Sequence, residues 1–120
     1  MSTAAGRQGE TAAARYLERK GFGILARNIR LGRGELDIVA RKGDLLVFIE
    51  VKAHKHHDSG LMAVTPDKCS RLRSAAEAWL AVHPAYTGLQ CRFDLIILTP
   101  GTGFFRWNQN QIDHIEDIIR

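Results

Sequence analysis

The sequence predicts an α/β fold in which a central mixed β-sheet is flanked by helices. Two observations support this fold class. Helical and extended patterns follow one another in the order helix, strands, helix, strands, and two of the extended runs flank a turn signal that is typical of a β-hairpin. The 120 residues are the size of one ordinary domain, so we expect a single domain over residues 1–120.

The first expected element is a helix over residues 7–20, which is rich in good helix formers and is followed by Gly21. Glu10, Ala13 and Leu17 have the spacing i, i+3, i+7 and therefore lie on one stripe of this helix. Because the other two residues of the stripe are apolar, the stripe should face the sheet. We therefore expect Glu10 to be an acid on a buried face.

Strands are expected next. Residues 24–29 predict a short extended stretch, and residues 30–34, with two glycines and two arginines, predict a loop or turn. Residues 35–40 and 45–52 are rich in Leu, Ile and Val and flank the turn residues 41–44, which indicates a hairpin. The second hairpin strand is apolar on both faces for most of its length, as in a strand that is covered on both sides.

A second helix is expected after an irregular stretch over residues 53–64. Thr65, Pro66 and Asp67 supply an N-cap, a proline at the first helical position and an acid in the first turn. The helix should stop near Pro84. Its apolar stripe is formed by Leu72, Ala75, Ala76, Trp79 and Leu80. We expect Trp79 in the core rather than as a stacking platform for bases.

The last part of the chain predicts more strands. Residues 92–99 indicate a buried strand, and residues 104–107 a short one after the turn 101–103. Residues 112–119 fit either a helix or a final strand, and the spacing of their four isoleucines favours the helix.

The hairpin register decides whether two acids meet. With a two- or four-residue turn centred on Lys42 and Gly43, Asp37 would face Phe48. It would then lie diagonal to Glu50 on the same side of the sheet, with α-carbons about 7–8 Å apart. A turn of odd length would instead send Asp37 to the opposite face.

Glu50 and Lys52 occupy positions i and i+2 of the second hairpin strand and so share a face. A buried acid and lysine are costly unless they are paired or bind an ion. With Asp37 and Glu10, three acids and a lysine would converge from one helix and two strands. Such hard oxygen ligands suit Mg²⁺ or Mn²⁺.

This constellation predicts phosphodiester hydrolysis. Asp37, Glu50 and a backbone carbonyl near Val51 would hold the cation, which would activate water and neutralise developing charge. Lys52 would orient or deprotonate that water and add positive charge, while Glu10 would hold the metal or a water in its shell. The alternative is a purely structural Glu50–Lys52 ion pair at a strand end, since a lone E-x-K motif is a weak signal.

The basic excess suits a polyanionic partner. The formal charge is +4 and the pI about 9.4, and phosphate contacts by Lys and Arg release counterions. The candidate contacts to a nucleic-acid backbone are Arg27, Arg30, Arg33 and Lys55, with ordinary solvated charge as the alternative. Glu35 lies on the same face as Asp37 and is a candidate partner for one of these arginines.

Three further observations concern the setting of the protein. His54, His56 and His57 lack a nearby thiolate pair, so a polar loop is favoured over a zinc site. Cys69 and Cys91 are far apart and are expected to be buried thiols in a reducing, cytoplasmic compartment. No secretion signal and no apolar run of membrane-spanning length is evident in the sequence.

The ordered set of motifs resembles the YraN family of uncharacterised bacterial proteins, and the resemblance covers nearly the whole chain. The motifs are Gly9-Glu10, Ala12-Ala13, Tyr16-Leu17, Gly21-Phe22, Ile24-Leu25, Asn28, Arg30, the run 34–40, the run 46–52, Arg92-Phe93-Asp94 and His114-Ile115. The resemblance implies a restriction-endonuclease-like core, similar to archaeal Holliday junction resolvases, with a metal-dependent nuclease site at Glu10, Asp37, Glu50 and Lys52. His54 departs from the arginine often present there, which would weaken a phosphate contact.

Two functions follow as hypotheses. The first is a Mg²⁺- or Mn²⁺-dependent endonuclease that acts on DNA, with branched or junction DNA among its candidate substrates; a homodimer would suit such a substrate. The second is a non-catalytic nucleic-acid-binding or adaptor protein on the same fold. An RNA nuclease stays open as well, because RNA and DNA present the same phosphates.

Overall fold

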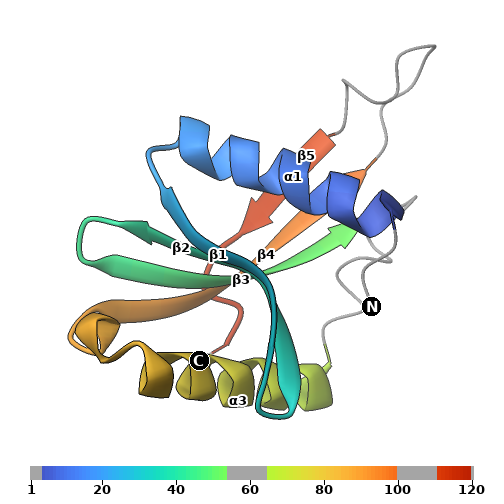
Figure 1. The fold of residues 1–120 in the computed structure, drawn as a ribbon. Coiled ribbons are helices and arrows are strands. Elements are labelled where there is room, and N and C mark those ends of the chain that lie inside the picture. Colours follow the sequence, from blue (N-terminus) through green and yellow to red (C-terminus); the bar gives the residue numbers. More distant parts are fainter. Residues whose placement is uncertain (1–3, 54–64, 100–110, 120) are drawn as a thin grey trace.

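The computed structural model describes residues 4–53, 65–99 and 111–119. In these residues two helices cover opposite faces of a five-stranded sheet (Figure 1). The elements are α1 (Ala4–Arg19), β1 (Gly23–Leu31), β2 (Gly34–Lys42), β3 (Leu45–Ala53), α3 (Pro66–Val82), the short 3-10 helix η1 (Pro84–Tyr86), β4 (Gln90–Thr99) and β5 (Gln111–Ile115).

The sheet is mixed, and its strands lie in the order β1-β2-β3-β4-β5. β1–β2, β2–β3 and β4–β5 pair antiparallel, whereas β3 and β4 pair parallel across the connection that contains α3. The predicted α/β fold with a mixed sheet between helices is therefore confirmed, and it is compatible with a restriction-endonuclease-like core.

The core has two apolar clusters, one on each face of the sheet. On the α1 face, Ala13 and Leu17 are fully buried, as their stripe predicted. On the α3 face, Trp79 is 2% exposed and packs edge-on against Phe48, so its predicted place in the core is confirmed. Thr65 caps α3, since its hydroxyl accepts a hydrogen bond from the Lys68 backbone N–H.

The predicted hairpin register is wrong by two residues. Lys42 pairs with Leu45, so the turn consists of Gly43 and Asp44 and is centred one residue later than predicted. Gly43 has φ 59°, the positive value that a two-residue hairpin turn can require at its first position. Phe48 therefore pairs with Val39 rather than with Asp37. The number of turn residues is still even, which leaves Asp37 on the predicted face.

The preferred helix over residues 112–119 is also wrong. Residues 111–115 form β5, which pairs antiparallel with β4, and Asp117 follows with φ 60°. Isoleucine is β-branched and favours strands, so pairing with a neighbouring strand outweighs the helical spacing. The predicted loop 30–34 is narrower than expected, because β1 extends to Leu31 and β2 begins at Gly34.

Two predicted segments fall on residues that the structure does not describe. The irregular stretch over residues 53–64, with its histidines, and the short strand over residues 104–107 lie outside the described residues, save for Ala53, which ends β3. Both cysteines are free, but neither is buried: Cys69 is partly exposed and Cys91 is exposed. No helix in the described part of the chain is long and apolar enough to cross a membrane.

The β1–β2 hairpin bends away from the sheet toward α3. Its pairing with β3 stops at Ile38–Ile49, while β1 and β2 stay paired to their ends, and the hairpin tip lies against α3 (Figure 1). Glycines permit this contact: a Cβ on Gly34 would overlap the carbonyl oxygen of Arg71, and one on Gly32 would lie 2.9 Å from Ser74 Oγ. The docked tip thereby forms a wall of the cleft described below.

Candidate functional site

A cleft of about 690 Å³ lies between the β1–β2 hairpin tip, the first residues of β2, the last residues of β3 and the first turns of α3. It is lined by Arg30, Gly32, Arg33, Gly34, Glu35, Asp37, Glu50, Val51, Lys52, Thr65, Asp67, Lys68, Arg71 and Leu72. The lining is rich in charge of both signs, and it contains three of the four predicted catalytic residues.

Asp37 and Glu50 open onto the same cleft, although both are buried, with 9% and 6% of their surface exposed. Asp37 sits where β2 leaves β3, and its Oδ2 accepts a hydrogen bond of 2.8 Å from the Val51 backbone N–H. Burial, and next the negative charge of Glu50, raise the pKa of Asp37 to about 8. A proton therefore compensates this carboxyl group near neutral pH, in a place where a bound cation could do so instead.

Two lysines contact one oxygen of Glu50. Lys52 Nζ lies 3.0 Å and Lys68 Nζ 2.9 Å from Glu50 Oε1. Burial disfavours the charged form of Lys52, but its hydrogen bond and ion pair with Glu50 and the nearby charge of Asp37 outweigh this, so the pKa of Lys52 is raised. Lys52 is thus an ammonium ion at neutral pH.

Glu10 lies beside Asp37 but is not among the residues that line the cleft. It is 6% exposed, as the stripe of α1 predicted, and its Oε2 is buried without a hydrogen-bond partner. Burial raises its pKa, while hydrogen bonds with Asn28 and Asp37 and the charge of Arg27 oppose that rise. A buried carboxylate oxygen without a donor is unusual and calls for a ligand or a proton.

The donor set fits a magnesium-type ion. Among the residues that the structure describes, no three His, Cys, Asp or Glu side chains are grouped as metal ligands. Mg²⁺ is usually held by only one or two carboxylates, with waters and substrate phosphates completing its shell. Asp37 and Glu50 supply those two carboxylates, and the orphaned Oε2 of Glu10 is a further hard oxygen next to them.

Two of the four residues predicted to contact nucleic acid line the cleft. Arg30 and Arg33 line the cleft, whereas Arg27 is exposed, does not line it, and donates to Thr11 Oγ1. Arg30 forms a long 3.9 Å ion pair with Glu35, in line with the arginine partner considered for that acid. Lys55 lies outside the described residues. The role of these residues in binding stays a prediction.

Sequence reasoning missed Lys68 and Asn28. Lys68 precedes Leu72 by four residues, which places a lysine on the apolar stripe of α3, and this is the same signal that identified Glu10. Asn28 has φ 53° within β1, at the position that faces Asp37 in the β1–β2 register. A left-handed residue within a strand has no signal in the apolar pattern, although asparagine tolerates that conformation better than most residues.

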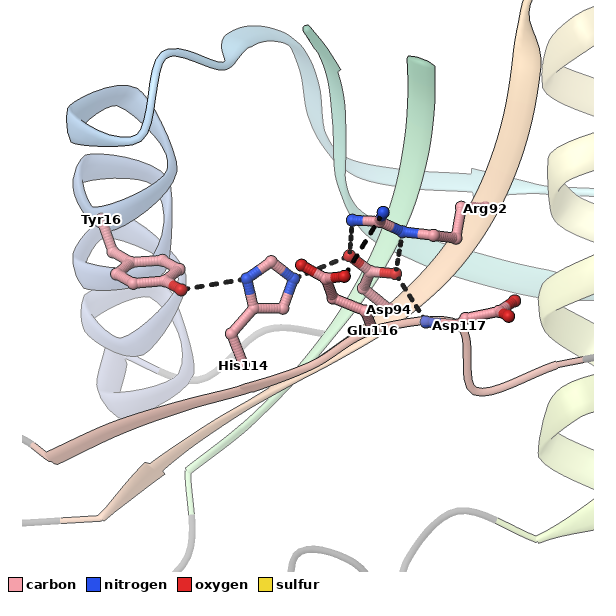
Figure 2. Close-up of polar contacts among 6 residues, drawn as sticks. All are labelled: Tyr16, Arg92, Asp94, His114, Glu116 and Asp117. Carbon is pink, nitrogen blue, oxygen red and sulfur yellow. Dashed lines mark hydrogen bonds and ion pairs between the residues drawn. The ribbon is translucent and has the colours of Figure 1, made fainter.

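A second polar cluster lies on the α1 face (Figure 2). At its centre is Asp94, which is fully buried next to Ile49 in β3. Arg92 donates two 2.8 Å hydrogen bonds to it, His114 Nε2 lies 2.7 Å away, and the Asp117 backbone N–H donates at 3.0 Å. The other ring nitrogen of His114, Nδ1, lies 3.0 Å from the Tyr16 hydroxyl oxygen. This network ties β5 and the segment after it to β4 and α1.

Comparisons with known proteins agree on one family. The model of the family described as "Uncharacterised protein family UPF0102" matches residues 9–98. The chain is 46% identical over 97 residues to a UPF0102 protein of Rhodopseudomonas palustris strain CGA009, covering 81% of this chain and 75% of the relative. It is 48% identical over 95 residues to one from strain BisA53, covering 79% and 73%. It is 45% identical over 91 residues to one from Bradyrhizobium diazoefficiens, covering 76% and 68%.

Proposed function

The chain belongs to the uncharacterised protein family UPF0102, as its YraN-like motifs predicted, and we propose that it is a nuclease that hydrolyses phosphodiester bonds with the help of Mg²⁺ or Mn²⁺. One observation carries the proposal: Asp37 and Glu50 are buried together at one cleft, beside the ammonium group of Lys52. Two buried carboxylates repel each other, so the arrangement is unfavourable without a proton or a cation to compensate it.

The carboxylates would hold the cation in this proposal. Asp37 would exchange its proton for the ion, Glu50 would contribute an oxygen from the next strand, and Glu10, whose Oε2 has no partner, would hold the ion or a water in its shell. A backbone carbonyl near Val51 remains the further ligand that we predicted. When bound, the ion would activate water and offset the negative charge on the phosphoryl oxygens.

Lys52 would act through its charge. Its raised pKa favours a permanent ammonium ion over a general base, because a base must be deprotonated near the working pH. Of the two roles predicted for it, orienting the attacking water and adding positive charge is the one this environment supports. A fixed positive charge within a partly buried site stabilises the negative charge that develops on the phosphate.

Nucleic acid is the proposed substrate because five basic side chains line the cleft beside its acids. Arg30, Arg33 and Arg71 line the cleft together with the two lysines, and phosphate contacts of this kind position a strand without reading its bases. Within the proposal the substrate is DNA, with branched and junction DNA included, the setting is the cytoplasm, and a homodimer would supply two active sites for paired cuts.

One observation favours the second candidate, a non-catalytic adaptor that binds nucleic acid. Glu50 Oε1 already has two ammonium partners, as expected for an ion-pair cluster retained for its structure alone. In such a protein the basic cleft would bind phosphates, and no cation would be needed. The two candidates differ in whether a divalent cation changes what the protein does.

A panel of labelled linear, flapped and four-way DNA and RNA substrates, incubated with Mg²⁺, Mn²⁺ or EDTA, separates them. The proposal predicts cleavage that requires the cation and falls by about 10³-fold in Lys52→Ala, because a charge at the reacting phosphate is lost. Lys42→Ala is the matched control. Lys42 is an exposed lysine whose Nζ donates to the Lys20 carbonyl oxygen, and it does not line the cleft. Binding without cleavage under every cation would identify the adaptor, and full activity of folded Lys52→Ala would exclude the proposed site.

A further inference from the structure

Lys68 reaches the carboxylate site from the opposite wall of the cleft. Its ammonium group lies 2.9 Å from Glu50 Oε1, and that of Lys52 lies 3.0 Å from the same oxygen. Lys52 comes from β3, two residues after Glu50. Glu50 is 7% exposed at its side chain and Lys68 is 31% exposed. A half-buried lysine from α3 therefore shares one oxygen with a lysine from β3.

Helix α3 fixes the backbone position of Lys68 but not the position of its ammonium group. Its backbone N–H donates to Thr65 Oγ1 in the cap of α3, and its position four residues before Leu72 directs the side chain toward the sheet. Four methylene groups then carry the ammonium group to Glu50. Such a flexible stem lets the charge move by several ångströms while the helix stays in place.

A divalent cation and two ammonium ions would compete for the same oxygen. A carboxylate oxygen has two lone pairs, and Glu50 Oε1 already accepts both lysines. A divalent cation that binds this oxygen displaces at least one of them, and one that binds the other oxygen of Glu50 brings its two charges close to both ammonium groups and repels them. Lys52 is the more buried lysine and is held two residues from Glu50, whereas Lys68 is more exposed and lines the cleft. Lys68 is the group that can leave.

We propose that Lys68 is a phosphate-binding residue that holds Glu50 in the cation-free protein and turns to the substrate phosphodiester when a divalent cation binds. This inference rests on the proposed function for its substrate. In it, one positive charge serves two successive states: it compensates Glu50 before the cation arrives, and it contacts a non-bridging phosphate oxygen afterwards. Lys68 would thus make cation binding and nucleic-acid binding strengthen each other.

The first readout is Mn²⁺ binding without nucleic acid, measured by calorimetry on the full chain. Lys68→Met removes the competing cation, so the variant should bind Mn²⁺ tighter by roughly 1.5- to 5-fold, the equivalent of one partly exposed ion pair. The matched control is Lys42→Met, which removes the charge of an exposed lysine that contacts the Lys20 carbonyl oxygen and does not line the cleft. That control should leave Mn²⁺ affinity unchanged. Thermal unfolding shows whether both variants are folded.

The second readout is the affinity for a DNA oligonucleotide with and without Mn²⁺. In the wild type, Mn²⁺ should strengthen DNA binding by more than it does in Lys68→Met, and Lys68→Arg should recover part of the difference because it restores the charge. Unchanged or weaker Mn²⁺ binding in folded Lys68→Met, or an equal gain in DNA affinity in both proteins, would overturn the inference. Both readouts are independent of cleavage, so a wild type that cuts nothing would defeat the proposed nuclease while leaving Lys68 tested.

Discussion

Two buried acidic clusters of this protein solve the same electrostatic problem in opposite ways. Burial alone would raise the pKa of Asp94, but hydrogen bonds from His114, Arg92 and the Asp117 backbone outweigh it, and the pKa is lowered. Burial likewise raises the pKa of Asp37, and its acidic neighbours raise it further, to about 8. Asp94 is compensated within the protein, whereas Asp37 is not.

The two clusters also differ in access. Asp94 is 0% exposed and both of its oxygens have protein donors, so nothing further can bind there. Asp37 and Glu50 line a cleft, and Glu10 next to them keeps an oxygen without a partner. Burial of a carboxylate therefore does not by itself identify a functional site. The informative feature is a buried charge whose compensation is left to something outside the chain.

The largest effect on stability is expected at Asp94. Asp94→Asn removes the negative charge that holds Arg92 and His114, which leaves a charged group without its buried partner. The free energy of unfolding in urea should fall by about 3–5 kcal/mol. Cleavage measured well below the unfolding transition should change little, because the cluster lies on the α1 face, away from the residues that line the cleft.

A graded control accompanies this variant. Tyr16→Phe removes only the outer contact to His114 and should lower the free energy of unfolding by about 0.5–1.5 kcal/mol. Equal losses in both variants, or a loss of cleavage that exceeds the loss of folded protein, would show that the cluster is more than a structural tie.

A smaller effect of opposite sign is expected at Asp37. Its folded pKa, about 8, lies above the value of about 3.9 in an unfolded chain, so the folded protein binds this proton more tightly. The corresponding stability is present at low pH and is lost as the pH rises through about 8. Asp37→Asn removes the titrating group, so the variant does not lose stability in this way as the pH rises. In EDTA at pH 9 the variant should therefore be more stable than the wild type by about 1–3 kcal/mol.

The pH profile gives the contrast with Asp94. Asp94 has a lowered pKa, so its contribution to stability is present above the unfolded value of about 3.9 and is lost as the pH falls. Urea titrations from pH 4 to 9 should thus show Asp37→Asn gaining on the wild type toward high pH. A variant that is less stable than the wild type at pH 9 would mean that the Asp37 carboxylate is compensated within the chain after all.

Much of the site could be predicted because it follows local rules. The stripe of Glu10, Ala13 and Leu17 depends only on helical spacing, and the shared face of Glu50 and Lys52 only on strand alternation. Lys68 follows the same rule on α3, because it lies four residues before the buried Leu72. Periodicity therefore finds charged residues on buried stripes, whichever element carries them.

The rest depends on contacts between distant elements. The hairpin register differs from the predicted one by two residues because the turn lies at Gly43 and Asp44, and only the even length of the turn kept Asp37 on the correct face. The segment 111–115 became a strand because β4 offered an edge to pair with. The bend at Asn28 and the docking of Gly34 on α3 arise from packing, which no local pattern encodes.

The most direct test is the number of protons released when Mn²⁺ binds, measured by calorimetry in buffers of different ionisation enthalpy. If the ion takes the place of the proton on Asp37, the wild type should bind Mn²⁺ at one saturable site and release close to one proton at pH 7, and clearly less at pH 9, where Asp37 is already ionised. Glu77→Gln, which alters an exposed acid of α3 that does not line the cleft, should behave like the wild type. Absence of saturable binding, or binding that survives unchanged in Asp37→Asn, would contradict a cation site at these carboxylates.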